Sequence, residues 1–274
     1  MPKRPLVVSF ANSDYLGVLA NWLVGFRRLG LPMPRIYCLD ERTQRWARRW
    51  GCSTRLMEWD GDLAGLWKMR ISVFADLADK GVDFIHSDLD AVWLRDPVAD
   101  PELTAPEADM VFSQGTVWPR DVFDKQDFVL CCGWFLMRPS EAVKGFLNAL
   151  GEHVEETGDD QVSLNRLLGE TAWSTDQVRS YRLAHKADLF RCWQGAVRGR
   201  NDEFGLDIAL APHGRIQRVD DPWPEPAIRH VLTPKSAEDK LTALFEQGLL
   251  MLREPRAPAE WAPLEALEGE RKAA

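Results

Sequence analysis

Strand-like and helix-like segments alternate regularly from the N-terminus to Asp88. Short apolar runs typical of buried strands lie at residues 6–10, 35–39, 53–57 and 82–88. Segments with apolar residues at helical spacing separate them, at residues 12–30, 41–50 and 63–80. Strands joined by helical crossovers pair in parallel with right-handed connections. The sequence therefore predicts an α/β fold, namely a Rossmann-like three-layer sandwich with a mostly parallel central sheet.

The second half of the chain is less regular. Strands are expected at residues 109–113, 128–137, 208–210 and 216–219, and helices at 140–154, 160–168 and 236–249. No internal repeat is present. We therefore expect one domain over residues 1–254, followed by a flexible Pro-, Ala- and Glu-rich tail over residues 255–274.

Two carboxylates one residue apart follow the fourth predicted strand. Asp88 and Asp90 lie at its carboxyl end, where ligands of open α/β sheets collect. Such hard oxygen ligands suit Mg²⁺ or Mn²⁺, often together with substrate phosphates. Another pair, Asp60 and Asp62, flanks a glycine in a turn before a helix, where aspartate is an ordinary turn or capping residue. Context therefore makes Asp88 and Asp90 the candidate metal site.

Composition and charge limit the possible partners. The chain is 45% hydrophobic and 28% charged with a net charge of −8, which is typical of a globular protein and argues against nucleic-acid binding. No apolar run reaches the length of about 18 residues that a transmembrane helix needs. The five cysteines lack C-x-x-C spacing, so we expect free thiols in a reducing cytoplasm.

The aspartate pair belongs to a longer motif. Residues 88–97 read DLDAVWLRDP, which resembles the D-x-D-x-x-W-L-R-D-P signature of the nucleotide-diphospho-sugar transferase family, glycosyltransferases of the GT-A fold. Residues 131–140, CCGWFLMRPS, resemble the family's N-x-G-F-F-x-x-R-P-S strand, and Asp160-Gln161 resembles its D-Q helix start. The likeness covers about residues 5–253 and departs from the pattern at Cys132, where we expect Asn or another small polar residue.

The resemblance implies a metal-dependent glycosyltransferase. It would move a sugar from a nucleoside-diphosphate sugar, UDP-linked, to an acceptor hydroxyl with retention of the anomeric configuration. His230 resembles the late histidine that reaches back to the metal, and with Asp88 and Asp90 it would bind Mn²⁺ (or Mg²⁺). The acceptor would be a glycan, a protein or a small molecule.

The resemblance also implies donor-binding and catalytic residues. The donor site would include Ala11, Asn12, Lys68, Ser87, Asp88 and Lys235. Catalysis would involve Asp159, Asp160 and Gln161.

Ordinary structural roles compete with several of these assignments. Asp159 and Asp160 are also favoured helix caps, and Lys68 and Lys235 could be solvated. Arg191, Arg198 and Arg200 could contact an anionic acceptor or form a solvated face, and exposed tryptophans such as Trp118 or Trp134 could stack on a sugar ring. His86 is interpreted as structural and is expected to point to the strand face opposite Asp88.

Two functions of other classes remain open. Asp88 could be the nucleophile of a haloacid-dehalogenase-like phosphatase, with Asp220 and Asp221 as the later acidic pair, although that motif normally follows the first strand. The chain could also be an inactive sugar-nucleotide-binding protein. A sugar-1-phosphate nucleotidyltransferase should carry a glycine-rich loop after its first strand, and residues 11–14, ANSD, contain no glycine.

The distance along the chain between Asp90 and His230 carries a further expectation. If both residues bind one metal, residues 222–235 must fold back over the carboxyl edge of the sheet. The segment is rich in proline and no regular element is predicted in it. We therefore expect a lid that becomes ordered when the donor binds.

Overall fold

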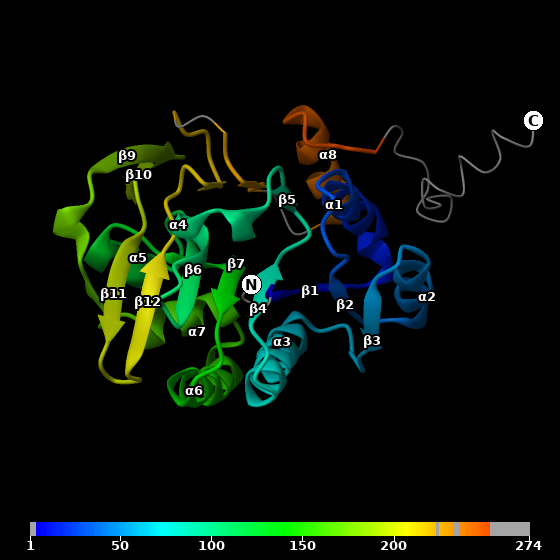
Figure 1. The fold of residues 1–274 in the computed structure, drawn as a ribbon, viewed down its shortest axis with the longest axis horizontal. Coiled ribbons are helices and arrows are strands. Elements are labelled where there is room, and N and C mark those ends of the chain that lie inside the picture. The colour runs from blue at the N-terminus through cyan, green and yellow to red at the C-terminus, as the bar shows by residue number, and fades with distance from the viewer. Residues whose placement is uncertain (1–3, 223–224, 233–235, 253–274) are drawn as a thin grey trace, which may run out of the picture.

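The computed structural model describes residues 4–222, 225–232 and 236–252. Its centre is a nine-stranded sheet with the order β3-β2-β1-β4-β7-β6-β12-β11-β8 (Figure 1). The first half contains the parallel strands β1 (Leu6–Ala11), β2 (Arg35–Cys38), β3 (Ser53–Leu56) and β4 (Phe84–Ser87). Helices α1 (Leu16–Arg28), α2 (Glu41–Arg49) and α3 (Leu63–Asp79) connect them, so the predicted strand–helix units are confirmed.

The second half of the sheet contains the reversed strands. β7 (Leu130–Met137) lies antiparallel between β4 and β6 (Met110–Gln114). β6 pairs in parallel with β12 (Leu206–Leu210), and β11 (Val197–Asn201) runs antiparallel between β12 and β8 (Ala172–Trp173). Within this sheet only β7 and β11 run against the other strands, so the expectation of a mostly parallel sheet is confirmed.

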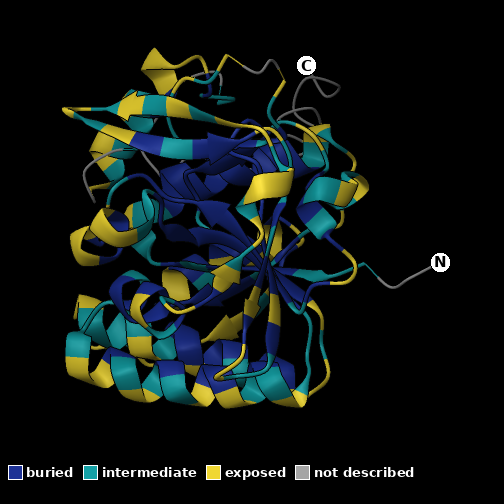
Figure 2. Ribbon diagram, turned by 90° about the vertical axis from the view of Figure 1, so that its left-hand side faces the viewer, coloured by how far each residue is buried: buried dark blue, intermediate teal, exposed yellow. Residues whose placement is uncertain are grey.

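Helices cover both faces of the sheet because alternate strand residues point to opposite sides. Val7 and Ile85 pack with α1, α2 and α8 (Ala237–Glu246), whereas Val8 and Phe84 pack with α3, α6 (Glu141–Thr157) and α7 (Asp160–Leu167). Figure 1 shows α3 and α6 side by side on one side of the strands and α1 and α8 on the other. The strands are the most buried part of the molecule (Figure 2). The predicted three-layer sandwich is therefore confirmed.

Several elements after residue 90 were not expected from the sequence. The short helices α4 (Pro101–Thr104) and α5 (Arg120–Gln126) were not predicted, nor was the hairpin of β9 (Ser180–His185) and β10 (Asp188–Trp193). Phe190 and Cys192 of this hairpin bury against Val122 and Phe123 of α5 and form a small separate core. The hairpin is difficult to predict from the sequence because its apolar residues pack against α5, which lies far from it along the chain.

A second small sheet contradicts the expectation that residues 222–235 contain no regular element. Ile228–His230 form β14, which pairs in parallel with β13 (Ile216–Gln217) and antiparallel with β5 (Ala91–Trp93). Both edges of β14 are thereby paired, which stabilises so short a strand. The expectation of a lid without regular structure is therefore wrong for Ile228–His230, which form a strand paired on both edges. Residues 223–224 and 233–235 of the same segment lie outside the described residues.

The C-terminal helix is joined to the first helix by a buried amide. Asn21 of α1 donates to the backbone carbonyl of Leu249 at 3.2 Å and accepts from the backbone N–H of Met251 at 2.5 Å. These bonds fix the chain that leaves α8 against α1. The expected tail, residues 255–274, lies outside the described residues, and among the described residues no helix has the length and apolarity to cross a bilayer.

Candidate metal centre

The pairing of β5 with β14 brings the two aspartates and His230 together. Asp88 and Asp90 lie in the turn between β4 and β5, at the carboxyl edge of the sheet. In the antiparallel register of β14 and β5, His230 lies opposite Ala91, the residue after Asp90. The N–H of Val231 also donates to the carbonyl of Asp90 at 3.2 Å. Backbone hydrogen bonds therefore place His230 beside residues that precede it by 140 positions or more.

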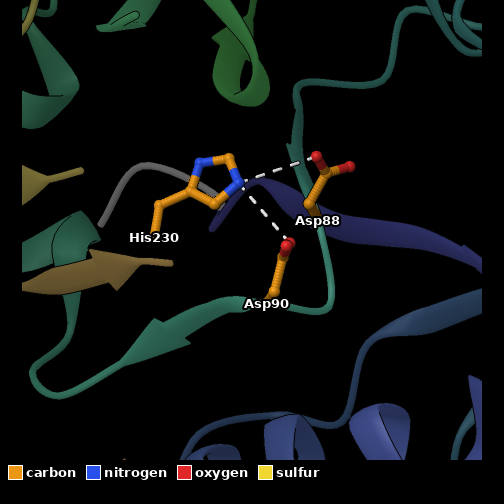
Figure 3. Close-up of side chains that lie close together, drawn as sticks. All are labelled: Asp88, Asp90 and His230. Carbon is orange, nitrogen blue, oxygen red and sulfur yellow. Dashed lines mark ion pairs between the residues drawn. The ribbon is translucent and has the colours of Figure 1, made fainter. Parts of the chain in front are cut away.

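One nitrogen of the His230 ring faces both carboxylates (Figure 3). His230 Nε2 lies 3.8 Å from Asp88 Oδ2 and 3.4 Å from Asp90 Oδ1, and one ligand atom from each residue lies within 4.8 Å of the others. Asp90 and His230 are buried, but the side chain of Asp88 is 35% exposed, so a ligand can reach the cluster from solvent. Two carboxylates and one imidazole fit a divalent cation of the Mn²⁺ type, with further positions left for substrate oxygens.

Buried cations surround the two aspartates. Arg70 of α3 is 3.7 Å from Asp88 and 3.4 Å from Asp160, and Lys240 of α8 forms an ion pair with Asp90. Burial alone would raise the pKa of Asp88, but the hydrogen bond from His86 and the charge of Arg70 outweigh it and lower this pKa well below its usual range. For Asp90 burial again opposes ionisation, and His230 and Lys240 lower its pKa. Both aspartates are therefore carboxylates, the form that binds a metal.

The groups around His230 shift its pKa in opposite directions. Burial and Arg218 favour the neutral ring, yet Asp90 outweighs them and raises the pKa of His230 to about 9. On the other side of the ring, Nδ1 lies 3.9 Å from Cys131 Sγ, and Arg218 donates to the same sulfur. Burial would raise the pKa of Cys131, but Arg218 and His230 lower it to about 7. Nδ1 therefore faces an acceptor and Nε2 faces the carboxylates.

The space for His230 depends on Gly133 of β7. A methyl group built on Gly133 would place its carbon 2.0 Å from His230 Cε1 and 2.8 Å from Asp88 Oδ2, far inside contact distance. The carbonyl of Gly133 also accepts from the N–H of Asp88 at 2.7 Å. Gly133 therefore holds the aspartate turn through its backbone and leaves room for the imidazole.

Helix α7 positions the other predicted catalytic residues. Asn165 of α7 pairs with both backbone groups of Leu130 at the start of β7, which fixes the helix beside the metal cluster. Asp160 is buried, and this burial raises its pKa although Arg70 partly offsets the effect. Gln161 donates to the carbonyl of Trp118 at 2.8 Å and accepts from the N–H of Cys132 at 3.3 Å. Asp159 caps the helix by accepting from the N–H of Val162 at 2.9 Å, the structural role that competed with catalysis.

Several residues expected at the site lie elsewhere or already form hydrogen bonds within the protein. Lys68 is exposed on α3 and makes no ion pair with the aspartates, because Arg70, two positions further, is the basic residue on their side of the helix. The Ser87 hydroxyl is fully buried and accepts from the Trp93 indole at 3.1 Å, so it is not available to a nucleotide. Trp134 is buried and cannot stack on a sugar, and Lys235 lies outside the described residues.

The arginine cluster is a solvated face with carboxylate partners. Arg191 pairs with Asp127, Arg198 with Glu107, and Arg200 with Asp202 and Asp207. The alternative of a solvated face therefore describes these three residues.

The expectation for His86 is wrong. Residues two apart on a strand share a face, and His86 Nε2 lies 3.2 Å from Asp88 Oδ1 and 2.8 Å from Arg70 Nη2. Burial and the charge of Arg70 lower the pKa of His86 to about 4, so its ring is neutral. The strand periodicity could have identified this contact. Lys240 and Arg218 carry no such local signal, because each reaches the site only through the tertiary fold.

A second buried network holds the loop that carries Arg218. His213 Nδ1 lies 2.7 Å from Asp221 Oδ2, and the Tyr181 hydroxyl donates to the same oxygen at 2.6 Å. His213 Nε2 accepts from the N–H of Arg218 at 3.1 Å, so its proton resides on Nδ1 and is donated to Asp221. The side chains of His213 and Asp221 are both fully buried. This network joins the β9–β10 hairpin to the loop before β14.

Comparisons with known proteins agree with this geometry. A model of the family described as nucleotide-diphospho-sugar transferase matches residues 36–194, more than half of the chain. Among curated proteins, no sequence matches significantly.

Solved structures share the fold at low sequence identity. The galactosyltransferase LgtC, in complex with donor and acceptor sugar analogs, has a TM-score of 0.51 at 14% identity, covering 91% of this chain and 97% of LgtC. An active-site mutant of LgtC has the same TM-score at 13% identity and the same coverage. The bifunctional glycosyltransferase WbbM has a TM-score of 0.44 at 11% identity, covering 61% of this chain, which spans only 37% of WbbM. The likeness to LgtC concerns the fold alone.

The substitution Gly133→Ala should weaken metal binding. Its methyl group must displace the His230 ring, so we expect at least a 10-fold weaker Mn²⁺ affinity by calorimetry, about 1.4 kcal/mol. Gly145→Ala in α6 is the matched control, because a methyl group there meets no atom within 4 Å. Equal Mn²⁺ affinities of Gly133→Ala and the wild type would contradict the arrangement of His230 described above.

The stability of the protein should fall in mild acid because of His213. Burial lowers the pKa of His213, although its bond to Asp221 acts in the other direction. Below pH of about 6.5 the unfolded chain therefore takes up a proton that the folded ring resists, and the free energy of unfolding decreases. Urea unfolding at pH 7.5 and pH 5.5 should show a larger loss for the wild type than for His213→Gln. A parallel loss in both proteins would assign the acid sensitivity to other groups.

Proposed function

The chain belongs to the nucleotide-diphospho-sugar transferase family and is a glycosyltransferase of the GT-A fold, and from this premise we propose a metal-dependent transfer from a UDP-linked sugar to an acceptor hydroxyl. In the proposed reaction the anomeric configuration is retained, as the family resemblance implies. The observation that carries the metal dependence is the convergence of Asp88, Asp90 and His230 within 4.8 Å.

The proposed metal ligands are Asp88, Asp90 and His230. A bound Mn²⁺ or Mg²⁺ supplies Lewis-acid stabilisation of the charge that grows on the departing diphosphate. The donor set fits the ion because both aspartates are held as carboxylates and Asp88 stays accessible to solvent. The raised pKa of His230 means that its ring must release a proton to bind the ion. The backbone pairing of β5 with β14 holds the ligands in place before any ion binds.

The nucleotide is proposed to bind at the carboxyl ends of β1 and β4. The strand order β3-β2-β1-β4 reverses its direction of growth between these two strands, and ligands of open α/β sheets bind at such a switch point. Ala11 ends β1, and the buried Oδ1 of Asn12, the next residue, has no hydrogen-bond partner among the described residues. An acceptor atom left unpaired in this crevice suits a donor group of a nucleoside.

Lys240 is proposed to contact the diphosphate. Its ammonium group is held at Asp90 by an ion pair and is only partly exposed. A lysine at the metal cluster adds a positive charge where the donor brings a negative one. It takes the role expected of Lys68, whose side chain is exposed on α3.

Arg70 and Asp160 are proposed to contact the donor sugar. Arg70 bridges Asp88 and Asp160, so it joins the metal cluster to the start of α7. Asp160 is the acid of this region whose pKa is raised by burial, and it offers a hydrogen-bonding group in a dry environment. Gln161 holds the Trp118 loop through its amide, and the exposed Trp118 side chain is proposed as a platform for an acceptor sugar.

The phosphatase alternative receives no support. Asp221, a required member of its acidic pair, is buried against His213 and Tyr181, and Asp220 is paired with Arg229 at the surface.

All five cysteines are free in the structure, which supports a reducing compartment, and we place the reaction in the cytoplasm.

The activity can be tested with a panel of sugar nucleotides. We expect Mn²⁺-dependent release of nucleoside diphosphate from one or more of them, and Asp90→Asn should lower kcat/KM at least 100-fold, about 2.7 kcal/mol. Asp60→Asn is the control, because Asp60 belongs to the turn before α3. Donor binding without turnover in the wild type, even with acceptors present, would support the alternative of an inactive sugar-nucleotide-binding protein.

A comparison of Arg70 with Lys68 tests the assignment of the basic residue on α3. Arg70→Lys keeps the charge but cannot reach Asp88, Asp160 and the Cys132 carbonyl together, so kcat/KM for the donor should fall at least 10-fold. Lys68→Met should stay within about 2-fold of the wild type, because its side chain lies in solvent. Equal losses in both variants, measured as release of nucleoside diphosphate, would return the role to Lys68.

A further inference from the structure

Arg218 lies beside the metal cluster without a carboxylate partner. It follows β13, and its guanidinium donates to Cys131 Sγ, which lies 3.9 Å from His230 Nδ1. Among the described residues Arg218 forms no ion pair, and its buried Nε has no hydrogen-bond partner. A guanidinium offers five N–H donors, so the bond to Cys131 leaves most of them available. A half-buried arginine in this state is suited to an anionic ligand.

The fold holds Arg218 firmly in this position. Its backbone N–H donates to His213, whose other nitrogen donates to Asp221, and Asp221 also accepts from Tyr181. Burying a carboxylate is unfavourable unless hydrogen bonds satisfy it, as those from His213 and Tyr181 do for Asp221. On the following strand, Arg229 donates to Gln217 at 2.9 Å and to the carbonyl of Val219 at 3.3 Å. The backbone at Arg218 is therefore held on both sides before a ligand arrives.

The position of Arg218 separates it from the proposed nucleotide site. The proposed nucleotide site lies at the carboxyl ends of β1 and β4, on one side of Asp88 in the strand order. Cys131, which Arg218 contacts, lies on β7 opposite Ser113 of β6, on the other side of Asp88 in the strand order. Figure 3 shows one ring nitrogen of His230, Nε2, facing the carboxylates of Asp88 and Asp90. The other ring nitrogen, Nδ1, lies 3.9 Å from Cys131 Sγ. An anion at Arg218 therefore belongs to the second substrate.

We propose that Arg218 binds a negatively charged group of the acceptor, so that the acceptor is a carboxylate- or phosphate-bearing molecule with its reactive hydroxyl near the metal. This inference rests on the proposed transferase function and specifies its substrate class. A planar guanidinium binds either anion through two parallel hydrogen bonds. The net charge of −8 repels such an acceptor over most of the surface, so recognition requires a fixed local cation.

A structural role for Arg218 is the rival explanation. Through Cys131, Arg218 could simply orient His230 for the metal. The two roles differ in what a substitution changes, because loss of anion recognition leaves Mn²⁺ and UDP binding intact, whereas misplacement of His230 weakens both.

Calorimetry on the full-length protein, saturated with Mn²⁺ and UDP, distinguishes these roles. The probes are inorganic sulfate, methyl glucuronide and the neutral methyl glucoside. We expect the wild type to bind sulfate or methyl glucuronide more tightly than methyl glucoside. Arg218→Gln should weaken the anions at least 10-fold and leave UDP affinity within 2-fold, and Arg218→Lys should restore part of the loss. Arg42→Gln is the control, since Arg42 is an exposed arginine on α2 without an ion pair among the described residues.

The outcomes separate the inference from its premise. Preference for methyl glucuronide over sulfate would identify a carboxylate acceptor, and the reverse would identify a phosphate acceptor. Equal anion binding by the wild type and Arg218→Gln, or no anion binding by the wild type, would overturn the inference. A parallel loss of UDP affinity in Arg218→Gln would overturn it in favour of the orienting role. Failure of the wild type to bind Mn²⁺ and UDP at all would instead contradict the proposed function.

Discussion

The antiparallel pairing of β5 with β14 is the constraint on which the candidate site depends. It spans three residues on each strand, yet it places His230 opposite the residue that follows Asp90. Paired on its other edge with β13, β14 gains hydrogen bonds that an isolated strand of this length would lack. The turn of Asp88 and Asp90 supplies the carboxylates, and Gly133 leaves the space in which the imidazole meets them.

Charge balance explains the residues around this pairing. Two aspartates at a largely buried edge require positive partners, and Arg70, Lys240 and His230 provide them from α3, α8 and β14. Such a cluster is costly to bury unless the charges are paired. A divalent cation with a diphosphate would rearrange these pairs. The cluster therefore couples the sheet edge to α3 and to the last described helix, α8.

The candidate site has two sides. The switch in strand order at β1 and β4 and the unpaired amide oxygen of Asn12 form one side, which suits the nucleotide. Trp118, the β9–β10 hairpin and the loop of Arg218 form the other, where the His213–Asp221–Tyr181 network rigidifies the backbone. A nucleotide ligand on the first side agrees with the membership of the chain in the nucleotide-diphospho-sugar transferase family.

The sequence by itself determined the parallel half of the sheet and the aspartate pair of the candidate metal site. Strand and helix periods are local properties, and residues 88–97 form a contiguous motif, so both could be read without the fold. His230 was predicted through family resemblance, but its meeting with Asp90 is made by β14, a strand too short to show a period. Lys68 was expected near the aspartates, but Arg70 is the basic residue of α3 that lies beside Asp88, because the sequence shows the residue type on a helix and not which side faces the sheet. Lys240, Arg218 and the buried His213 network were decided by tertiary structure alone, since each depends on contacts between segments far apart in the chain.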